Sequence, residues 1–119
     1  VWDSTVTAAN TSSLDAAATW QGIRIANPTG LVTINGGSLL TLTPDIGVLG
    51  IDMTAAAAAT NNLTINASVA LGSEQTWNVA ASRVLSVSGA ISGSTPLTKA
   101  GAGQLTLGVT NTTTGGIVL

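Results

Sequence analysis

The sequence contains no cysteine, histidine, phenylalanine or tyrosine, and these absences restrict the chemistry that the chain can perform. Without cysteine it forms no disulfide and offers no thiolate nucleophile or thiolate metal ligand. Without histidine it lacks the commonest general base and metal ligand of proteins. Three tryptophans supply all its aromatic rings, so a core must be built from Val, Ile, Leu and Ala. The composition argues against an enzyme and predicts no cofactor.

Charged residues are also scarce. Three Lys or Arg and five Asp or Glu make up 7% of the 119 residues and give a net charge of −2. The basic residues Arg24, Arg83 and Lys99 are scattered, so the sequence has no basic patch for nucleic acid or for an anionic membrane surface. No apolar run approaches the about 20 residues that a membrane-spanning helix needs. We expect neither a nucleic-acid partner nor a membrane-spanning segment.

What the sequence does contain is a short pattern of residues, called here a phrase, that recurs along the chain with different amino acids. Two apolar residues flank one residue that is small or polar, and turn-forming Gly, Asn, Ser, Thr and Pro stand between the phrases. Such alternation predicts a strand with one face in a core and the other in water. The phrases are Ile23-Arg24-Ile25, Val32-Thr33-Ile34, Leu40-Thr41-Leu42, Leu63-Thr64-Ile65, Val69-Ala70-Leu71, Trp77-Asn78-Val79, Leu85-Ser86-Val87 and Leu105-Thr106-Leu107.

The spacing of the phrases predicts a coil. One set of centres, at Arg24, Thr41, Thr64, Ser86 and Thr106, is spaced by 17, 23, 22 and 20 residues, and a second runs through Thr33, Gly50 and Ala70. A repeat of roughly 20 residues is typical of solenoids. We therefore predict an all-β parallel β-helix, or β-solenoid, of about five to six coils. The competing fold is a sandwich of β-hairpins. It needs tight reversing turns of the Asn-Gly or Asp-Gly type, and Asn35-Gly36 is the only such dipeptide in the sequence.

The whole chain, 1–119, is predicted to be one solenoid module. Residues 1–19 hold one strand around Trp2–Val6 and a small-residue linker in which a helical turn capped by Ser13 is an alternative, and this segment is a candidate cap or linker. Residues 20–119 form the coils. Within them the run Ala55–Ala59 is expected to form a loop or a short helical cap.

One part of the sequence resembles a known repeat. The segment G-A-I-S-G at 89–93 is followed by L-T-K-A-G-A-G-Q-L-T-L at 97–107 and by N-T-T-T-G-G at 111–116. This order resembles the autotransporter-associated β-strand repeat, also called the passenger-associated transport repeat, and the resemblance is clearest over residues 71–116. Thr113 stands where the family usually has Tyr, so the turn lacks an aromatic cover and we expect its surface to pack against another group.

The resemblance implies a right-handed parallel β-helix in an exported protein at the surface of a Gram-negative-type bacterium or released from it. The sequence begins at Val1 without Met and shows no charged segment followed by an apolar stretch, and it ends in the apolar run Ile117-Val118-Leu119. We therefore interpret it as a mature product or a segment of a longer exported protein. Repeats of this family are associated with the passage and folding of long passengers outside the cell and with adhesin-like proteins.

The motif also has a physical interpretation of its own. Gly101 and Gly103 supply turns with positive φ or close backbone approach. Leu97, Leu105 and Leu107 are expected to fill one inner column of the core. The side chain of Asn111 is expected to bond the backbone of its own turn and to stack in a ladder with polar residues of adjacent coils.

Candidate reactive residues are few and have simpler explanations. Asp45 and Asp52 are the pair that a polysaccharide-cleaving β-helix would place face to face, but solvated turn acids explain them better. Lys99 is expected to be a surface charge in a turn rather than a nucleophile. The glycines Gly101 and Gly103 do not form a phosphate loop, and calcium-binding repeats of the G-G-x-G-x-D type are absent. We predict no catalytic, cofactor-binding or metal site.

Two further sets of residues leave alternatives open. Trp2, Trp20 and Trp77 are expected to be buried at coil edges or ends, the alternative being a sugar-binding strip. Four Asn-x-Ser/Thr triplets are glycosylation sites in a eukaryotic secretory route only, and are polar turns in a bacterial protein. The triplets begin at Asn10, Asn62, Asn66 and Asn111.

Together these observations predict a non-enzymatic structural module that acts as a stalk, fibre or adhesin scaffold. The open strands at the two ends of a solenoid favour stacking of copies or neighbouring repeats into a filament. The alternatives are a module that binds a surface glycan or protein and, third, a polysaccharide-cleaving enzyme. The fold prediction places an apolar set inside the coil: Ile23, Ile25, Ile34, Leu40, Leu42, Ile65, Leu71, Trp77, Val79, Leu85, Val87, Leu105 and Leu107.

Overall fold

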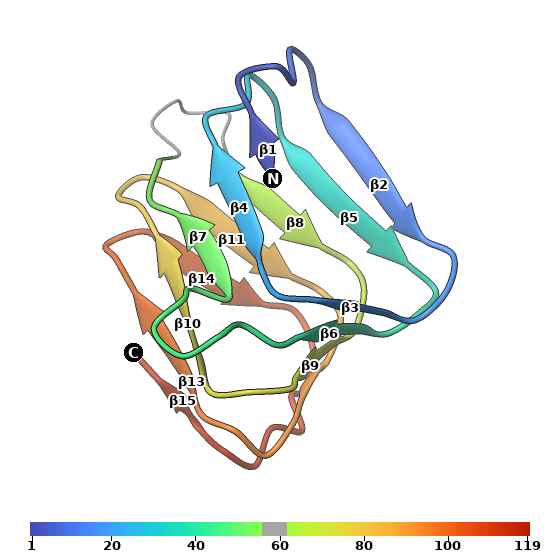
Figure 1. The fold of residues 1–119 in the computed structure, drawn as a ribbon, viewed down its shortest axis with the longest axis vertical. Helices are drawn as coiled ribbons and strands as arrows, with labels where there is room; N and C mark the ends of the chain where they lie inside the picture. Colours follow the sequence, from blue (N-terminus) through green and yellow to red (C-terminus); the bar gives the residue numbers. More distant parts are fainter. Residues whose placement is uncertain (56–61) are drawn as a thin grey trace.

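The computed structural model describes residues 1–55 and 62–119, and these residues form a parallel β-solenoid of about five turns (Figure 1). Every strand pairing among them is parallel. The predicted fold class is therefore confirmed, and the alternative sandwich of hairpins is excluded. None of the described residues belongs to a helix that could cross a bilayer.

The described strands form three sheets, named here by their strand numbers, and each full coil contributes one strand to each sheet. The six-stranded sheet contains, in spatial order, β1 (Trp2–Asp3), β4 (Ile23–Ala26), β7 (Ile51–Met53), β10 (Gln75–Val79), β13 (Leu97–Ala100) and β15 (Ile117–Val118). The five-stranded sheet contains β2 (Asn10–Leu14), β5 (Val32–Gly36), β8 (Leu63–Ile65), β11 (Val84–Val87) and β14 (Gln104–Leu107). The four-stranded sheet contains β3 (Ala18–Trp20), β6 (Leu40–Leu42), β9 (Val69–Leu71) and β12 (Ile91–Ser92).

The register of the sheets gives a repeat of about 22 residues. Asn10 pairs with Val32, and Leu63 pairs with Leu85, each 22 positions further along the chain. One coil is longer, because the segments after β6 and after β7 insert extra residues. The predicted repeat length is confirmed, and so is the alignment of Thr64, Ser86 and Thr106, which stack in the five-stranded sheet. The rest of the predicted alignment is wrong. Arg24, the centre of the first phrase, lies in the six-stranded sheet. Thr41 and Ala70 stack on each other in the four-stranded sheet, and Thr33 stacks on Thr64 in the five-stranded sheet.

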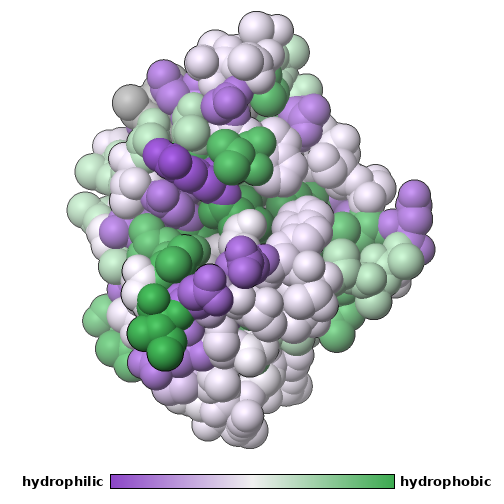
Figure 2. Space-filling view, in the orientation of Figure 1, coloured by the Kyte–Doolittle hydropathy of each residue, from purple (hydrophilic) through white to green (hydrophobic). Residues whose placement is uncertain are grey.

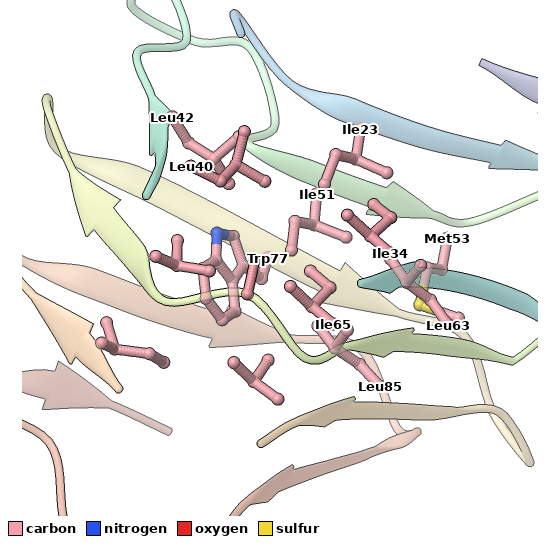
Figure 3. Close-up of a cluster of buried hydrophobic side chains, with 14 of the residues drawn as sticks. Ile23, Ile34, Leu40, Leu42, Ile51, Met53, Leu63, Ile65, Trp77 and Leu85 are labelled. Carbon is pink, nitrogen blue, oxygen red and sulfur yellow. The ribbon is translucent and has the colours of Figure 1, made fainter. Parts of the chain in front are cut away.

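Alternation of apolar and polar residues explains why these segments form strands. In β4 the side chains of Ile23 and Ile25 are buried while Arg24 between them is exposed. The same pattern recurs in β6, β7, β8 and β9, so successive coils place apolar side chains one above another. Figure 3 shows this core, in which aliphatic side chains from the three sheets surround the indole of Trp77. Each fully buried aliphatic side chain stabilises the fold by roughly 1.5–3 kcal/mol.

The predicted inward set is confirmed, with a difference at one end of the solenoid. Most of its members are almost completely buried. Leu105 and Leu107 in β14 are partly buried and pack against the core, because no further described coil covers them.

Residues 1–19 differ from the prediction. β1 ends at Asp3, where the Val6 amide donates to the Asp3 carbonyl in a turn, and Ser13 lies within β2 rather than capping a helical turn. β1, β2 and β3 pair with β4, β5 and β6, so this segment is the first coil. Pairing with the next coil outweighs the weak local preference of small residues. The run Ala55–Ala59 lies outside the described residues from position 56 onward.

The motif at 97–107 spans one turn of the coil, with β13 and β14 joined by a tight connection. Gly101 has the expected positive φ of 79°, and a side chain at Gly103 would overlap the carbonyl oxygen of Ala80. The prediction of a single column of leucines is wrong. Leu97 pairs with Gln75 in the six-stranded sheet, whereas Leu105 pairs with Leu85 in the five-stranded sheet.

Candidate functional site

The charged strand residues lie in the six-stranded sheet. Arg24 and Asp52 are register partners on adjacent strands, with the Arg24 Nε 3.6 Å from the Asp52 Oδ2. Asp3 and Lys99 lie in β1 and β13. Figure 2 shows one face of the molecule, where strongly hydrophilic residues form a few separate clusters beside hydrophobic patches and wide areas of intermediate hydropathy.

Asp3 and Asp52 are held in the same local arrangement. The Asp3 Oδ1 accepts hydrogen bonds from the Thr5 amide at 2.9 Å and from the Thr5 hydroxyl at 2.6 Å, and Thr54 donates in the same way to Asp52. The Thr5 hydroxyl and then the Thr5 amide hold the pKa of Asp3 below its ordinary value of 3.8, because both bonds favour the carboxylate. These acids stabilise the turns that follow their strands.

The acids weighed as a catalytic pair, Asp45 and Asp52, do not share either of the two hollows described here. Asp52 lines a hollow of about 400 Å³ beside Ile23 and Val48, and Glu74 lines a separate hollow of about 270 Å³ on the other side of the same loop. Asp45 is among the lining residues of neither hollow. Within residues 1–55 and 62–119, no three His, Cys, Asp or Glu side chains lie close enough to hold a metal ion.

Lys99 lies in β13 as the register partner of Trp77, not in a turn as predicted. Its ammonium donates a hydrogen bond to the Gly101 carbonyl. The contact places the Lys99 charge at the tight connection between β13 and β14. Lys99 is thus part of the motif's local structure.

The three tryptophans do not form a common strip. Trp77 is completely buried, and its Nε1 donates to the Gln75 Oε1 at 2.9 Å. Trp2 and Trp20 belong to the first coil, where both are partly buried against the core. The Trp2 Nε1 donates to the Asn10 Oδ1 at 2.8 Å. Burial at a coil end is confirmed for Trp2 and Trp20, whereas Trp77 lies in the interior.

The asparagines of the four Asn-x-Ser/Thr triplets hold neighbouring parts of the solenoid together. The Val84 amide donates to the Asn62 Oδ1 at 2.9 Å, and the Ile91 amide donates to the Asn111 Oδ1 at 2.8 Å. Asn111 therefore bonds the preceding coil, not its own turn as predicted. The predicted polar ladder exists elsewhere: Asn66 donates to Asn35 and accepts from Ser88.

The outer face of the five-stranded sheet is a regular polar surface. Between the inward positions of its strands, and just after β8 and β11, outward side chains form two rows that run across the sheet. The first row, called here the hydroxyl row, consists of Thr11, Thr33, Thr64, Ser86 and Thr106. The second row, the amide row, consists of Ser13, Asn35, Asn66 and Ser88. The two rows form an uncharged polar face.

Sequence reasoning missed this face although its signal was present. The middle residue of each phrase was interpreted only as a solvent-exposed position of a strand. The phrases of the three sheets are interleaved along the chain. The predicted spacing placed Thr64, Ser86 and Thr106 in one set, but it added Arg24 and Thr41 from other sheets and left out Thr33. Sorting the phrases by sheet depends on the insertions after β6 and β7.

Comparison with known proteins adds no relative. No family model matches the chain, and neither a curated protein nor a solved structure is significantly similar to it.

Proposed function

We propose that the chain is a non-enzymatic structural module, a β-solenoid that serves as stalk, fibre or adhesin scaffold in an exported bacterial cell-surface protein. The observation that carries the proposal is the continuous apolar core, which repeats from coil to coil and leaves only turns and sheet faces at the surface. Stacked coils of this kind suit a rigid spacer, because each coil contacts only its neighbours and length can be added without redesign.

The cell-surface assignment rests on the resemblance to the autotransporter-associated β-strand repeat. The residues of that motif fall on one unit of structure: L-T-K-A is β13, G-A-G is the connection and Q-L-T-L is β14. The scarcity of charged residues is consistent with a module that packs beside identical or similar modules, because few charges would repel one another there.

We further propose that copies or neighbouring repeats stack end to end. β14 has a hydrogen-bonded strand on one side only within the described residues, and its inward side chains Leu105 and Leu107 are partly exposed. Unpaired strand edges that carry apolar side chains invite another strand. A further coil at this end would bury both leucines.

The stacking proposal is tested by electron microscopy and sedimentation of the purified chain. We expect rods or filaments from the unmodified protein and short separate units from Leu107→Lys, because a charge that points into the joint resists burial. Thr106→Lys is the matched control, since Thr106 is on the same strand but faces outward and should leave stacking intact. A stable monomer at high concentration of the unmodified chain would contradict the proposal.

A second candidate, a module that binds a glycan or protein, is favoured by the uncharged face of the five-stranded sheet. A third, a polysaccharide-cleaving enzyme, is weaker because Asp45 and Asp52 line no common hollow. Incubation with neutral and acidic polysaccharides separates these hypotheses from the first. Turnover that is abolished by Asp52→Asn would establish the enzyme, whereas retention on a polysaccharide without turnover would establish the binding module.

A further inference from the structure

The hydroxyl row and the amide row lie on a face from which charge is excluded. None of the strands β2, β5, β8, β11 and β14 contains a charged residue, whereas the six-stranded sheet carries Asp3, Arg24, Asp52 and Lys99. None of the three tryptophans is on this face, since they lie in β1, β3 and β10. The face therefore offers a partner neither an opposite charge nor an aromatic ring on which to stack, which favours a neutral partner.

The positions of the hydroxyl groups are fixed by the backbone. Adjacent strands lie about 4.8 Å apart, and outward residues two positions apart on one strand are separated by about 6.6 Å. Four of the five residues in the hydroxyl row are threonines, whose branched Cβ restricts χ1 to few rotamers. The amide row is further fixed by the bonds of Asn66 with Asn35 and Ser88. The face is a rigid two-dimensional array, and Figure 1 shows its strands lying side by side.

The hydroxyls at the centre of the first row are available to a partner, whereas the Thr106 Oγ1 accepts a hydrogen bond from the Gln104 Nε2 at 3.0 Å. Within the described structure, the side chains of Thr33, Thr64 and Ser86 form no hydrogen bond with another group of the chain. A hydrogen bond to a partner replaces one to water, and it therefore contributes only about 0.5–1.5 kcal/mol net to binding. A flat polar face consequently binds well only when many such bonds form at once. A periodic partner can supply them, because it repeats at the interval of the strands.

We propose that the outer face of the five-stranded sheet binds the surface of ice. Ice presents neutral oxygen atoms in a planar lattice, at an interval along one axis close to the separation of adjacent strands. The hydroxyl row offers donors and acceptors at that interval, and the threonine methyl groups hold the water between them in place. Because the array is rigid before it binds, little conformational entropy is lost on contact. The proposal goes beyond the structural role and does not depend on it.

Growth of ice crystals in the presence of the full chain tests this proposal. We expect the unmodified protein to inhibit ice recrystallisation and to shape single ice crystals. Thr64→Tyr, at the centre of the hydroxyl row, should raise the concentration needed by about tenfold, which corresponds to about 1.4 kcal/mol. Thr41→Tyr is the matched control, because Thr41 is also an outward threonine with similar exposure but lies in the four-stranded sheet.

A second variant separates loss of the array from loss of the fold. Thr64→Val keeps the branched shape and removes the hydroxyl, and it should weaken inhibition with an unchanged circular dichroism spectrum. Ice growth unaffected by the folded unmodified chain would overturn the proposal, as would equal losses in Thr64→Tyr and Thr41→Tyr. Retention on an insoluble neutral polysaccharide, sensitive to Thr64→Tyr and without any effect on ice, would instead identify the face as a glycan surface.

Discussion

The side-chain amide of Gln75 shows how a buried polar group finds hydrogen-bond partners within this apolar core. Its side chain is 3% exposed and lies beside Trp77, which is completely buried. The amide nitrogen donates to the Leu42 carbonyl at 3.2 Å and to the Ser73 carbonyl at 3.1 Å, while the amide oxygen accepts from the indole. Gln75 thus satisfies the indole and ties β10 to the preceding coil.

Gln75→Leu is expected to destabilise the protein although it keeps a side chain of similar size. The indole N–H of Trp77 would lose its partner in a dry environment, which costs about 1–3 kcal/mol. Urea denaturation followed by tryptophan fluorescence measures this change. Thr76→Leu, at the next and outward position, is the control and should shift the midpoint little. Equal midpoints for Gln75→Leu and the unmodified chain would contradict this account of the amide.

A second prediction at the residue scale concerns Asp3 and pH. Bonds from Thr5 lower the pKa of Asp3 in the folded state, so its stabilising contribution is complete above the ordinary value of 3.8. The contribution is lost as the pH falls from that value through the lower folded pKa. Thr5→Val removes the hydroxyl bond and should raise the pKa of Asp3, as measured by an NMR titration of the carboxyl carbon. Thr7→Val should leave the titration unchanged.

At the scale of elements, each strand is stable only as a member of a stack. β11 is four residues long, yet Leu85 is completely buried because β8 and β14 place Leu63 and Leu105 on either side of it. A strand this short has no stability alone, and its side chains gain their burial from the coils above and below. Damage to a central strand should therefore affect the whole stack.

Leu85→Ala is expected to lower the free energy of unfolding by about 2–5 kcal/mol, because it leaves a cavity between two coils. Leu85→Asp should prevent folding, since it places an unpaired charge in the core. Ser86→Ala, the next residue, faces outward and should change stability by no more than about 0.5 kcal/mol. Circular dichroism during urea denaturation compares the three variants. Similar losses in Leu85→Ala and Ser86→Ala would mean that β11 is not packed as described.

At the scale of the whole molecule, the two ends of the solenoid differ. In the five-stranded sheet, Leu105 and Leu107 are the inward residues of the last described coil. The positions that align with them in the first coil are the polar Asn10 and Ser12, which the apolar Leu14 follows. The Asn10 side chain accepts bonds from Trp2 and, at 3.5 Å, from Ser12. At these two positions, a head-to-tail joint between copies would therefore bring apolar side chains against polar ones.

Ser12→Val measures how the polar end affects assembly. The substitution extends the apolar column of Ile34, Ile65 and Val87 to the first coil, and apolar surface contributes about 25 cal/mol per Å² when it is buried. If copies join head to tail, sedimentation should show larger assemblies at the same concentration. Ser13→Val, which faces outward, is the control. Unchanged association of Ser12→Val would mean that the first coil takes no part in the joint.

The sequence by itself determined the class of fold and the inward residues, because alternation decides which side of a strand is apolar and the scarcity of hairpin-type turns, with Asn35-Gly36 as the single such dipeptide, favours parallel coils. It also indicated the close approach at Gly103. The tertiary structure decided which strands are neighbours. Leu97 and Leu105 read alike in the sequence but belong to different sheets, and the polar first coil around Ser13 becomes strand only through pairing with β5. The physical reason is that the two patterns have different periods: alternation along a strand repeats every two residues, whereas stacking of coils repeats every 22 or so. Insertions between strands change the spacing of the coils but leave the alternation within each strand unaltered.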